Sequence, residues 1–351
     1  MRIGVIGAAG KIGQMRVETI LKNPGTTLAA VLDLTMEKAA AHAHGAPAFT
    51  DLGQFLAVPM DAVVISTPAH VREPICLAAF AKGLHVLTEK PLSNTVEGAR
   101  RIVEAARAAR RHLGAGFNMR YYPSFAYVKD VMESGEIGEI DHIRVYGGHS
   151  GLSNFTYEWE YKSEFLGGGA LSDVGIHMTD MARHLMGEIT RVYGVATNKV
   201  WGVPGSEDNA MAVYTAPSGL SATYQATWND WQGYKSMVEV FGTKGMVRGA
   251  YAPMRNDLIV LDKPGGAARR TTRRYFDIAV REKLKSWKTT AVQSFADELA
   301  DFLALVAGKT EGLRIADGHA SLRAIEVADA VRQSTRTGQA VELADLGPMR
   351  V

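Results

Sequence analysis

The sequence predicts an α/β protein in which a doubly wound parallel sheet is followed by a second α/β domain with a large, mostly antiparallel open sheet. Up to residue 120, short apolar runs alternate with helical patterns, which is typical of parallel strands joined by helices. Beyond residue 120, strands follow one another with Gly, Pro, Asn and Asp turns between them, which favours antiparallel pairing. We therefore expect two domains, residues 1–120 and 121–351, and the length of 351 residues fits that number at about 150 residues per domain.

The individual elements follow from hydrophobic periodicity. Near-continuous Val, Ile and Leu in the N-terminal strands predicts a sheet covered on both faces, whereas alternation in residues 220–228 predicts a strand with one open face. The last helix is expected to pack back on the first domain. In the first domain we expect strands at 2–6, 28–32, 61–66 and 84–88 and helices at 12–21, 36–44, 74–82 and 95–111. In the second we expect strands at 140–146, 192–201, 210–215, 221–227 and 236–241 and helices at 123–133, 170–185, 292–306 and 317–332.

The composition excludes several classes of protein. With 39 Lys+Arg against 37 Asp+Glu, the net charge of +2 gives no field that would favour nucleic acid or a membrane surface. Cys76 is the single cysteine, so an intramolecular disulfide and a thiolate metal cluster are both excluded, and a reducing compartment fits best. The apolar runs are far shorter than the ~20 residues of a membrane helix, and a strand at Arg2–Ile6 leaves no room for a leader. We expect a cytoplasmic protein.

A glycine-rich segment follows the first expected strand and opens the first expected helix. It reads Gly7-Ala-Ala9-Gly-Lys-Ile-Gly13, with Ala9 in place of the usual second glycine. Glycines there let the backbone approach a pyrophosphate that sits on the helix N-terminus. Asp33 ends the second strand, where a carboxylate accepts hydrogen bonds from the adenosine ribose and repels a 2′-phosphate. We predict a Rossmann domain that binds NAD rather than NADP; a plain glycine turn with a helix-capping Asp is the alternative. The expected cofactor residues are Gly7, Ala9, Gly10, Lys11, Ile12 and Asp33.

Two further motifs carry candidate chemistry. Glu89-Lys90-Pro91 comes just after an expected parallel strand, and ligands of such sheets bind beyond the carboxyl ends of the strands. The Lys90 ammonium could there stabilise a developing alkoxide or hydrogen-bond a hydroxyl, whereas an isolated lysine would be a solvated surface residue.

Asp173 and His177 are four residues apart in a glycine-rich helical segment, so they share one helix face. An imidazole can take the proton of an alcohol, and a carboxylate can orient a hydroxyl or hold the imidazole; a capping Asp and a core His are the alternative. The spacing does not favour a metal site.

Together these motifs resemble the glucose–fructose oxidoreductase / inositol dehydrogenase / rhizopine-catabolism (Gfo/Idh/MocA) family of NAD(P)-dependent dehydrogenases. The resemblance covers nearly the whole chain, and the Glu-Lys-Pro motif combined with Asp-x-x-x-His is its specific part. It also rests on the glycine loop, Ser66-Thr-Pro68, Asn118-Met-Arg120 with Pro123, and the helical C-terminal return.

The resemblance implies a Rossmann domain, a second domain with a large open sheet, and oxidation of a secondary hydroxyl of a sugar, sugar derivative or cyclitol. It implies that Lys90 is the motif lysine, Asp173 a substrate-orienting carboxylate and His177 the general acid/base. On the cofactor side it implies Thr67 and Pro68 along the nicotinamide and Glu89 near its ribose. The further expected cofactor residues are Ser66, His70 and Lys90. It further implies a homodimer or homotetramer formed through the open sheet.

The chain departs from the family pattern after the fourth strand. Where the family often has Thr-Pro-Asn-x-x-His, this chain has Thr67-Pro-Ala69-His70-Val-Arg72. Ala69 removes a polar contact to the cofactor, and Arg72 replaces the usual histidine. His70 could partly substitute, or it could be a surface residue at a helix start.

Several residues are weaker candidates. Aromatic side chains stack on sugar faces, and Asn and Tyr hydrogen-bond hydroxyls, although ordinary packing explains such residues equally well. Arg120 could instead pair with a carboxylate, and Trp228 and Trp231 are expected on or near the open sheet, at a subunit interface. The basic run Arg269–Arg274 is expected to be a solvated loop or a partner contact. The substrate-binding candidates are Lys90, Arg120, Tyr121, Asn154, Trp159, Tyr161, Asp173 and His177.

Three functions remain open at this level. The first is a dehydrogenase in which His177 removes the hydroxyl proton while hydride passes to the nicotinamide, with Lys90 polarising the oxygen. The second is an NAD-assisted glycosidase or epimerase of the same family, in which oxidation is transient. The third is a non-catalytic NAD-binding sensor, which would need the glycine loop but not the Lys90, Asp173 and His177 set. The catalytic hypotheses require that these three groups converge beside the reactive ring of the dinucleotide.

Overall fold

The computed structural model describes residues 1–344. These residues form two compact units. The first contains Met1–Asn118 and Lys285–Leu322, and the second contains Met119–Leu284 and residues 323–344. The two α/β architectures that the sequence predicts are both present, and each unit is built on one sheet.

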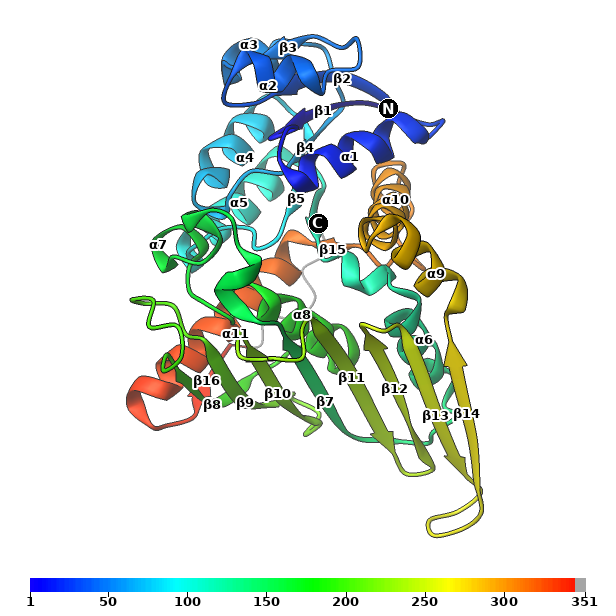
Figure 1. Ribbon diagram of the computed structural model, residues 1–351. Helices are drawn as coiled ribbons and strands as arrows, with labels where there is room; N and C mark the ends of the chain where they lie inside the picture. The colour runs from blue at the N-terminus through cyan, green and yellow to red at the C-terminus, as the bar shows by residue number, and fades with distance from the viewer. Residues whose placement is uncertain (345–351) are drawn as a thin grey trace. The chain divides into compact units, whose positions relative to one another are not determined.

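The first unit has a seven-stranded sheet in the order β15-β6-β5-β4-β1-β2-β3 (Figure 1). The pairs from β3 to β6 are parallel, and their order is that of a Rossmann fold. Short β15 adds an antiparallel edge next to β6. The strands are β1 (Arg2–Ile6), β2 (Thr27–Leu32), β3 (Ala48–Phe49), β4 (Ala62–Ile65), β5 (His85–Glu89), β6 (Leu113–Gly116) and β15 (Ala316–Asp317).

Helices cover this sheet and close its core. Strand residues such as Val5 and Val31 are fully buried, as expected for parallel strands that are covered on both faces. Leu299 and Phe302 of α10 join the same hydrophobic cluster, so the C-terminal return of the chain packs on this sheet. The helices of the unit are α1 (Lys11–Lys22), α2 (Met36–Ala41), α3 (Leu52–Leu56), α4 (Arg72–Ala81), α5 (Val96–Ala109) and α10 (Lys288–Val306), with a 3₁₀ turn at Ala69–Val71.

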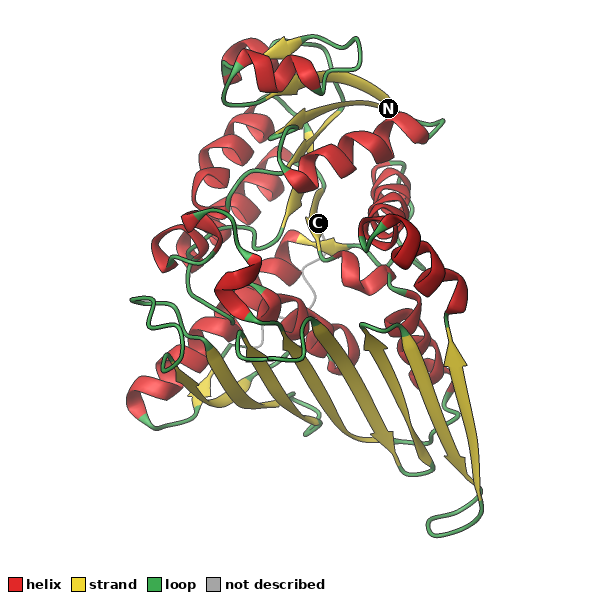
Figure 2. Ribbon diagram, in the orientation of Figure 1, coloured by secondary structure: helices red, strands yellow, loops and turns green. Residues whose placement is uncertain are grey.

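The second unit has a nine-stranded sheet in the order β14-β13-β12-β11-β7-β10-β9-β8-β16 (Figure 2). Its neighbouring strands are antiparallel except for the central β7 and β10, which are parallel. The strands are β7 (Ile140–Gly148), β8 (Arg191–Thr197), β9 (Asn209–Thr215), β10 (Ser221–Thr227), β11 (Lys235–Gly242), β12 (Gly245–Tyr251), β13 (Arg255–Leu261), β14 (Ala268–Arg274) and β16 (Val341–Glu342).

One face of this sheet carries helices, and α8 lies across β7 and β10. Gly147 of β7 allows the helix to come close, because a Cβ there would lie 2.7 Å from the Met178 side chain. The helices are α6 (Pro123–Ser134), α7 (Ser163–Leu166), α8 (Val174–Met186), α9 (Phe276–Lys285) and α11 (Gly318–Thr337), which starts in the first unit, and the 3₁₀ turns are Asn118–Tyr121, Gly151–Asn154 and Glu158–Glu160.

The basic run Arg269–Arg274 differs from its prediction as a solvated loop. Residues Arg269–Arg274 form part of the edge strand β14, paired with β13, and not a loop. Thr271 and Thr272 favour an extended chain, and every residue of the strand is exposed. Charged side chains on an edge strand discourage pairing with another chain, which gives this run a structural role.

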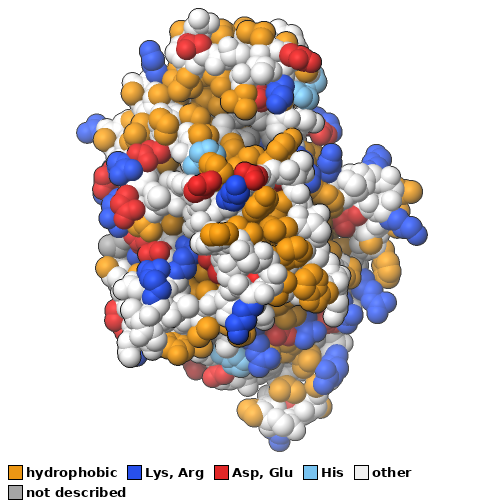
Figure 3. Space-filling view, turned by 60° about the vertical axis from the view of Figure 1, so that its left-hand side comes forward, with side chains coloured by type: hydrophobic (Ala, Val, Ile, Leu, Met, Phe, Trp, Pro, Cys, Tyr) orange, Lys and Arg blue, Asp and Glu red, His pale blue; other side chains and the backbone are white. Residues whose placement is uncertain are grey.

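Within residues 1–344, none of the helices is long and apolar enough to cross a membrane. Charged side chains of both signs are scattered among apolar ones on the face shown in Figure 3. This mixture agrees with the near-neutral net charge of +2.

Candidate functional site

The glycine-rich loop between β1 and α1 has the geometry of a dinucleotide site. Gly7 has a positive φ of 80°, and a Cβ there would lie 3.0 Å from the Ser66 backbone. A Cβ at Gly13 would lie 2.0 Å from the carbonyl oxygen of Gly7, so only glycine lets α1 pack this close to the loop. The first-turn N–H groups of α1 lack partners within the helix and can receive a pyrophosphate.

Asp33 joins this loop to the end of β2. Its Oδ2 accepts a hydrogen bond of 2.8 Å from the Ala9 N–H, and its Oδ1 accepts one of 2.8 Å from the Leu34 N–H. Each carboxylate oxygen has a second lone pair for a ribose hydroxyl. The cradle therefore fits NAD: the loop would hold the pyrophosphate and Asp33 the adenosine ribose. Lys11, at the start of α1, places its ammonium 4.7 Å from the Trp287 ring.

The loop after β4 contains the predicted nicotinamide-side residues. The Ser66 and Thr67 hydroxyls are buried and have no hydrogen-bond partner among residues 1–344. Unsatisfied buried hydroxyls are typical of a site whose ligand completes their bonds. Burial, with a contribution from the nearby Arg72 cation, lowers the pKa of His70, so this imidazole is neutral at pH 7.

The Glu89-Lys90-Pro91 motif begins at the last residue of β5, and buried side chains of the same unit hold it. Glu89 is buried, and its Oε1 accepts hydrogen bonds of 2.9 and 2.5 Å from Arg16 Nε and Nη2. The same guanidinium lies 2.6 Å from Glu298 of α10 and 4.0 Å from the Phe295 ring. The Glu89 carboxylate therefore anchors the motif to Arg16, and its contact with a nicotinamide ribose stays a prediction. Lys90 is half-buried.

Helix α8 presents the predicted catalytic pair. From residue 168 to residue 183, all of which the structure describes, Asp173 and His177 are the two residues that are not fully buried. Asp173 is the N-cap residue of the helix, and His177 lies one turn later on the same side. His184, two turns further along the helix, is half-buried as well. A titratable pair that stays accessible at the start of a mostly buried helix is suited to meeting a ligand.

Two donors that sequence reasoning did not assign hold the Asp173 carboxylate. His149 Nε2 lies 2.7 Å from Asp173 Oδ2, and the Trp228 indole N–H donates to the same oxygen at 3.0 Å. His149 Nδ1 accepts a hydrogen bond from the Gly151 N–H at 3.1 Å, so the ring proton is on Nε2. A histidine directly after strand β7 was the signal available in the sequence.

Trp228 lies next to the open sheet, as the sequence predicts. Its side chain directly follows β10 and is fully buried, so it is not exposed for contact with another subunit. Trp231, in contrast, is 66% exposed, with its ring centroid 6.1 Å from that of Trp201.

Arg120 pairs with a carboxylate, the structural role considered for it. Its Nε and Nη2 donate to the two oxygens of Asp180 at 2.8 and 2.6 Å, and both residues are buried. Tyr121 beside it is buried as well. Neither side chain is accessible in the way that Asp173 and His177 are, and their contact with substrate stays a prediction.

The remaining candidates lie in the segment after β7. Asn154 is exposed, and its amide contacts His149 Nδ1 at 3.2 Å. Tyr161 is half-buried and stacks on Phe155 at 6.1 Å, and Phe155 in turn contacts Trp228 edge-on at 5.4 Å. Trp159 is 39% exposed and stacks on Tyr157. Asn154 and Tyr161 are thus connected to the Asp173 surroundings through their neighbours.

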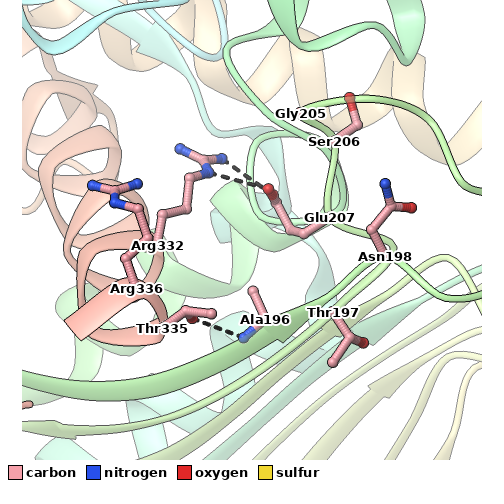
Figure 4. A pocket seen from close by; sticks show the side chains of 9 residues that line it. All are labelled: Ala196, Thr197, Asn198, Gly205, Ser206, Glu207, Arg332, Thr335 and Arg336. Carbon is pink, nitrogen blue, oxygen red and sulfur yellow. Dashed lines mark hydrogen bonds and ion pairs between the residues drawn. The ribbon is translucent and has the colours of Figure 1, made fainter. Parts of the chain in front are cut away.

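Glu207 and Arg332 line a small pocket in the second unit (Figure 4). Glu207 accepts hydrogen bonds from the Gly169 and Leu171 N–H groups at 2.9 and 3.0 Å, and Arg332 donates to Glu207 and to Ser172. A Cβ at Gly169 would lie 2.0 Å from the Glu207 carbonyl oxygen. The glycines therefore let a neighbouring loop approach the start of α8. The pocket is about 260 Å³ and is lined by Ala196, Thr197, Asn198, Gly205, Ser206, Glu207, Arg332, Thr335 and Arg336.

Comparison with known proteins identifies the family. Residues 1–117 match the model of the GFO/IDH/MocA oxidoreductase family with an NAD-binding Rossmann fold, and residues 125–248 match the model of the GFO/IDH/MocA C-terminal domain. The inositol 2-dehydrogenase 4 of Saccharopolyspora erythraea is 31% identical over 311 residues, covering 83% of this chain and 85% of that protein. The chain belongs to the GFO/IDH/MocA family. Its first unit is the NAD-binding Rossmann fold of an oxidoreductase.

Two other relatives cover nearly the whole chain. The inositol 2-dehydrogenase of Rhizobium meliloti (strain 1021) is 27% identical over 351 residues, covering 98% of this chain and 99% of that protein. A solved levoglucosan dehydrogenase, in complex with NADH and L-sorbose, superposes with a TM-score of 0.84 at 22% identity and covers 99% of both chains. The structural likeness shows a shared fold.

Proposed function

We propose that this member of the family is an NAD-dependent dehydrogenase that oxidises a secondary hydroxyl of a sugar, sugar derivative or cyclitol. The observation that carries the proposal is the accessible Asp173 and His177 pair at the start of a mostly buried helix, in a chain whose other unit is an NAD-binding Rossmann fold. The relatives named inositol 2-dehydrogenase and levoglucosan dehydrogenase support the substrate class.

The three catalytic residues have separate tasks. The His177 imidazole accepts the proton of the hydroxyl that is oxidised, and returns it in the reverse reaction. The Lys90 ammonium donates a hydrogen bond to the same oxygen and stabilises the negative charge that develops there. NAD, when bound, takes up the carbon-bound hydrogen as hydride.

Asp173 orients the substrate. The His149 and Trp228 N–H groups both donate to Oδ2, which fixes the plane of the carboxylate. A fixed carboxylate accepts a hydrogen bond from a substrate hydroxyl in one geometry and so selects the carbon that faces the cofactor. The half-buried His177 lies one helical turn away, within reach of the same small molecule.

The preference for NAD over NADP rests on the end of β2. The Asp33 carboxylate is next to the glycine loop, where its charge repels a 2′-phosphate. Leu34, the next residue, is 88% exposed and offers no cation to such a phosphate. We expect Asp33→Ser to weaken discrimination between the two cofactors.

We also propose that the open face of the second sheet pairs two copies of the chain. Tyr193 and Val195 of β8 pair in register with Val213 and Met211 of β9, and each of the four side chains is 45–52% exposed. Contiguous exposed apolar side chains on a sheet mark interaction surfaces. The cytoplasmic location expected from the single cysteine stays a prediction.

The test is a spectrophotometric screen of sugars and cyclitols with NAD and NADP side by side. We expect NADH to accumulate with at least one polyol. His177→Ala and Lys90→Ala should each lower kcat at least about 100-fold while NADH still binds, measured by fluorescence. His184→Ala, on the same helix, is the matched control and should retain activity.

Other outcomes of the screen would favour one of the alternative functions or refute the assigned roles. Product without accumulated NADH would favour transient oxidation, as in an NAD-assisted glycosidase or epimerase. Tight NADH binding with no turnover of any polyol would favour the sensor hypothesis. Full activity in both His177→Ala and Lys90→Ala would refute the assigned roles.

A further inference from the structure

Arg72 connects two loops of the NAD-binding unit. It begins helix α4, and its side chain is buried between the loop after β4 and the loop after β5. Its Nε and Nη2 donate to the Thr67 carbonyl oxygen at 3.0 and 2.5 Å. Its Nη1 donates to the Glu89 carbonyl oxygen at 2.7 Å and also to the Pro91 carbonyl oxygen. One guanidinium therefore joins both loops.

The buried Arg72 cation is bound by backbone carbonyl oxygens and not by a carboxylate. All four hydrogen bonds that Arg72 forms within residues 1–344 run to backbone carbonyls, and none runs to a carboxylate. Burial lowers the pKa of Arg72 to about 10, so the group is still a cation at neutral pH. A buried cation is stable only when its donors are satisfied, so the loops have to keep their carbonyls in place around it.

The two carbonyls on Nη1 flank one residue. Glu89 O belongs to the peptide before Lys90, and Pro91 O lies on the other side of the same residue. The guanidinium is planar and its donors keep fixed directions, so it holds these carbonyls in one arrangement. The Glu89 side chain is fixed independently by Arg16. The backbone of Lys90 is thereby held on both sides, while its own side chain remains half-buried.

We propose that Arg72 is a positioning residue for Lys90: by tying the carbonyls of Thr67, Glu89 and Pro91 together, it sets the place of the Lys90 ammonium relative to the nicotinamide-side loop. The proposal rests on the role of Lys90 in the proposed function. It assigns to Arg72 a task that a histidine, with two ring nitrogens and no fork of donors, cannot perform in the same way.

A double-mutant cycle tests the proposal. Arg72→Gln should lower kcat about 100-fold, because a displacement of about 1 Å at a catalytic group has an effect of this size, and the KM for NAD should change less than about threefold. Arg72→Lys keeps the charge but not the fork, and should recover part of the activity. If Arg72 acts through Lys90, adding Arg72→Gln to Lys90→Ala should lower kcat no further than Lys90→Ala alone. Multiplicative losses would overturn the proposal.

Arg111→Gln is the matched control. Arg111 is half-buried and donates to the Gly83 carbonyl oxygen just before β5, at the opposite end of the strand from Lys90. This variant should keep kcat within about threefold of wild type, because it disturbs a loop carbonyl but not the motif. An equal loss in Arg111→Gln and Arg72→Gln would indicate general damage to the unit and contradict the proposal.

A second readout does not depend on activity. Lysines are labelled by reductive ¹³C-methylation, and the Lys90 signal is assigned as the one absent from Lys90→Ala. In Arg72→Gln and Arg72→Lys we expect this signal to shift and its titration midpoint to move, and in Arg111→Gln we expect no change. An unchanged Lys90 signal in a folded Arg72→Gln would overturn the proposal even if no polyol substrate is found. A shifted signal without any turnover would leave Arg72 as the positioning residue and reject the dehydrogenase function.

Discussion

Helix α8 carries two carboxylates whose surroundings differ. The Asp180 side chain is 1% exposed and bound by both arms of the Arg120 guanidinium. The Asp173 side chain is 21% exposed and held on one oxygen by His149 and Trp228. The first has a cation that neutralises its charge inside the fold, whereas the second is oriented by two donors and stays accessible.

The comparison shows how a paired and buried charge differs from an accessible one in this chain. A buried carboxylate has to be paired, because an unpaired buried charge destabilises the fold strongly. Asp180 and Arg120 meet that requirement, and both are buried. Asp173 is fixed but still reachable, which is the condition for orienting a small molecule.

We expect the largest effect on activity from a substitution of Asp173. Asp173→Asn keeps the shape but removes the charge that orients the substrate, so kcat/KM should fall about 100- to 1,000-fold. The melting temperature should stay within a few degrees of wild type, because the site is accessible. The measurement is steady-state kinetics together with thermal unfolding, and a large loss of stability with activity preserved per folded molecule would abolish the distinction.

For Asp180→Asn we expect a loss of stability with activity preserved. This change leaves the buried Arg120 cation without a charged partner and should reduce the free energy of unfolding by about 3–5 kcal/mol. The folded fraction should retain most of its kcat. Urea unfolding followed by tryptophan fluorescence measures the first quantity, and unchanged stability would show that this pair is not structural.

A smaller effect should follow when one donor to Asp173 is removed. Trp228→Phe preserves most of the buried ring but removes the N–H that donates to Oδ2. We expect the KM for the polyol to rise and kcat to fall, together about tenfold in kcat/KM, with NADH affinity unchanged. Trp231→Phe, at a 66% exposed position, is the control and should leave kcat/KM unchanged. Equal effects of the two changes would argue against a role for the Trp228 N–H.

Burial also affects an imidazole of the first unit. His85, at the start of β5, accepts a hydrogen bond from the His112 N–H and stacks on that ring at 5.2 Å. Burial, with the neighbouring His112 and Arg111, lowers the pKa of His85 to about 4. The unfolded chain therefore binds the proton first, and the stability that neutral His85 contributes above pH 6.5 is lost as the pH falls toward 4.

This smallest effect is measurable by urea unfolding at pH 7.5 and pH 5. We expect the partly exposed His85 to account for about 1 kcal/mol of the loss of stability between these values. His85→Asn should remove that part of the pH dependence. An identical pH dependence in wild type and His85→Asn would show that this imidazole titrates normally.

The sequence was sufficient where a structural feature depends on local spacing. Strand Arg2–Ile6, the glycine loop after it and Asp33 were predicted from contiguous residues, and the structure joins Ala9 to Asp33 directly. The pair Asp173 and His177 followed from helical periodicity in the same way. Such features need only the geometry of one strand or one helix.

Long-range contacts were beyond sequence reasoning. Arg16 meets Glu298, and Asp173 meets Trp228, across large separations along the chain that no periodicity links. Arg72 was recognised as a departure from the family pattern, but its three carbonyl partners depend on where two loops end. The arginines of strand β14 predict a solvated loop, because they outweigh the signal of Thr271 and Thr272 for an extended chain.

The most direct test of the central claim follows one hydrogen atom. The polyol that gives the fastest NADH formation is prepared with deuterium at the carbon of the oxidised hydroxyl, and the reduced cofactor is isolated and examined by NMR. The account predicts one deuterium in the reduced dinucleotide, a ketone as the product, and loss of the transfer in His177→Ala while NADH still binds. Deuterium that stays on the product, or passes to water, would contradict net oxidation by hydride transfer.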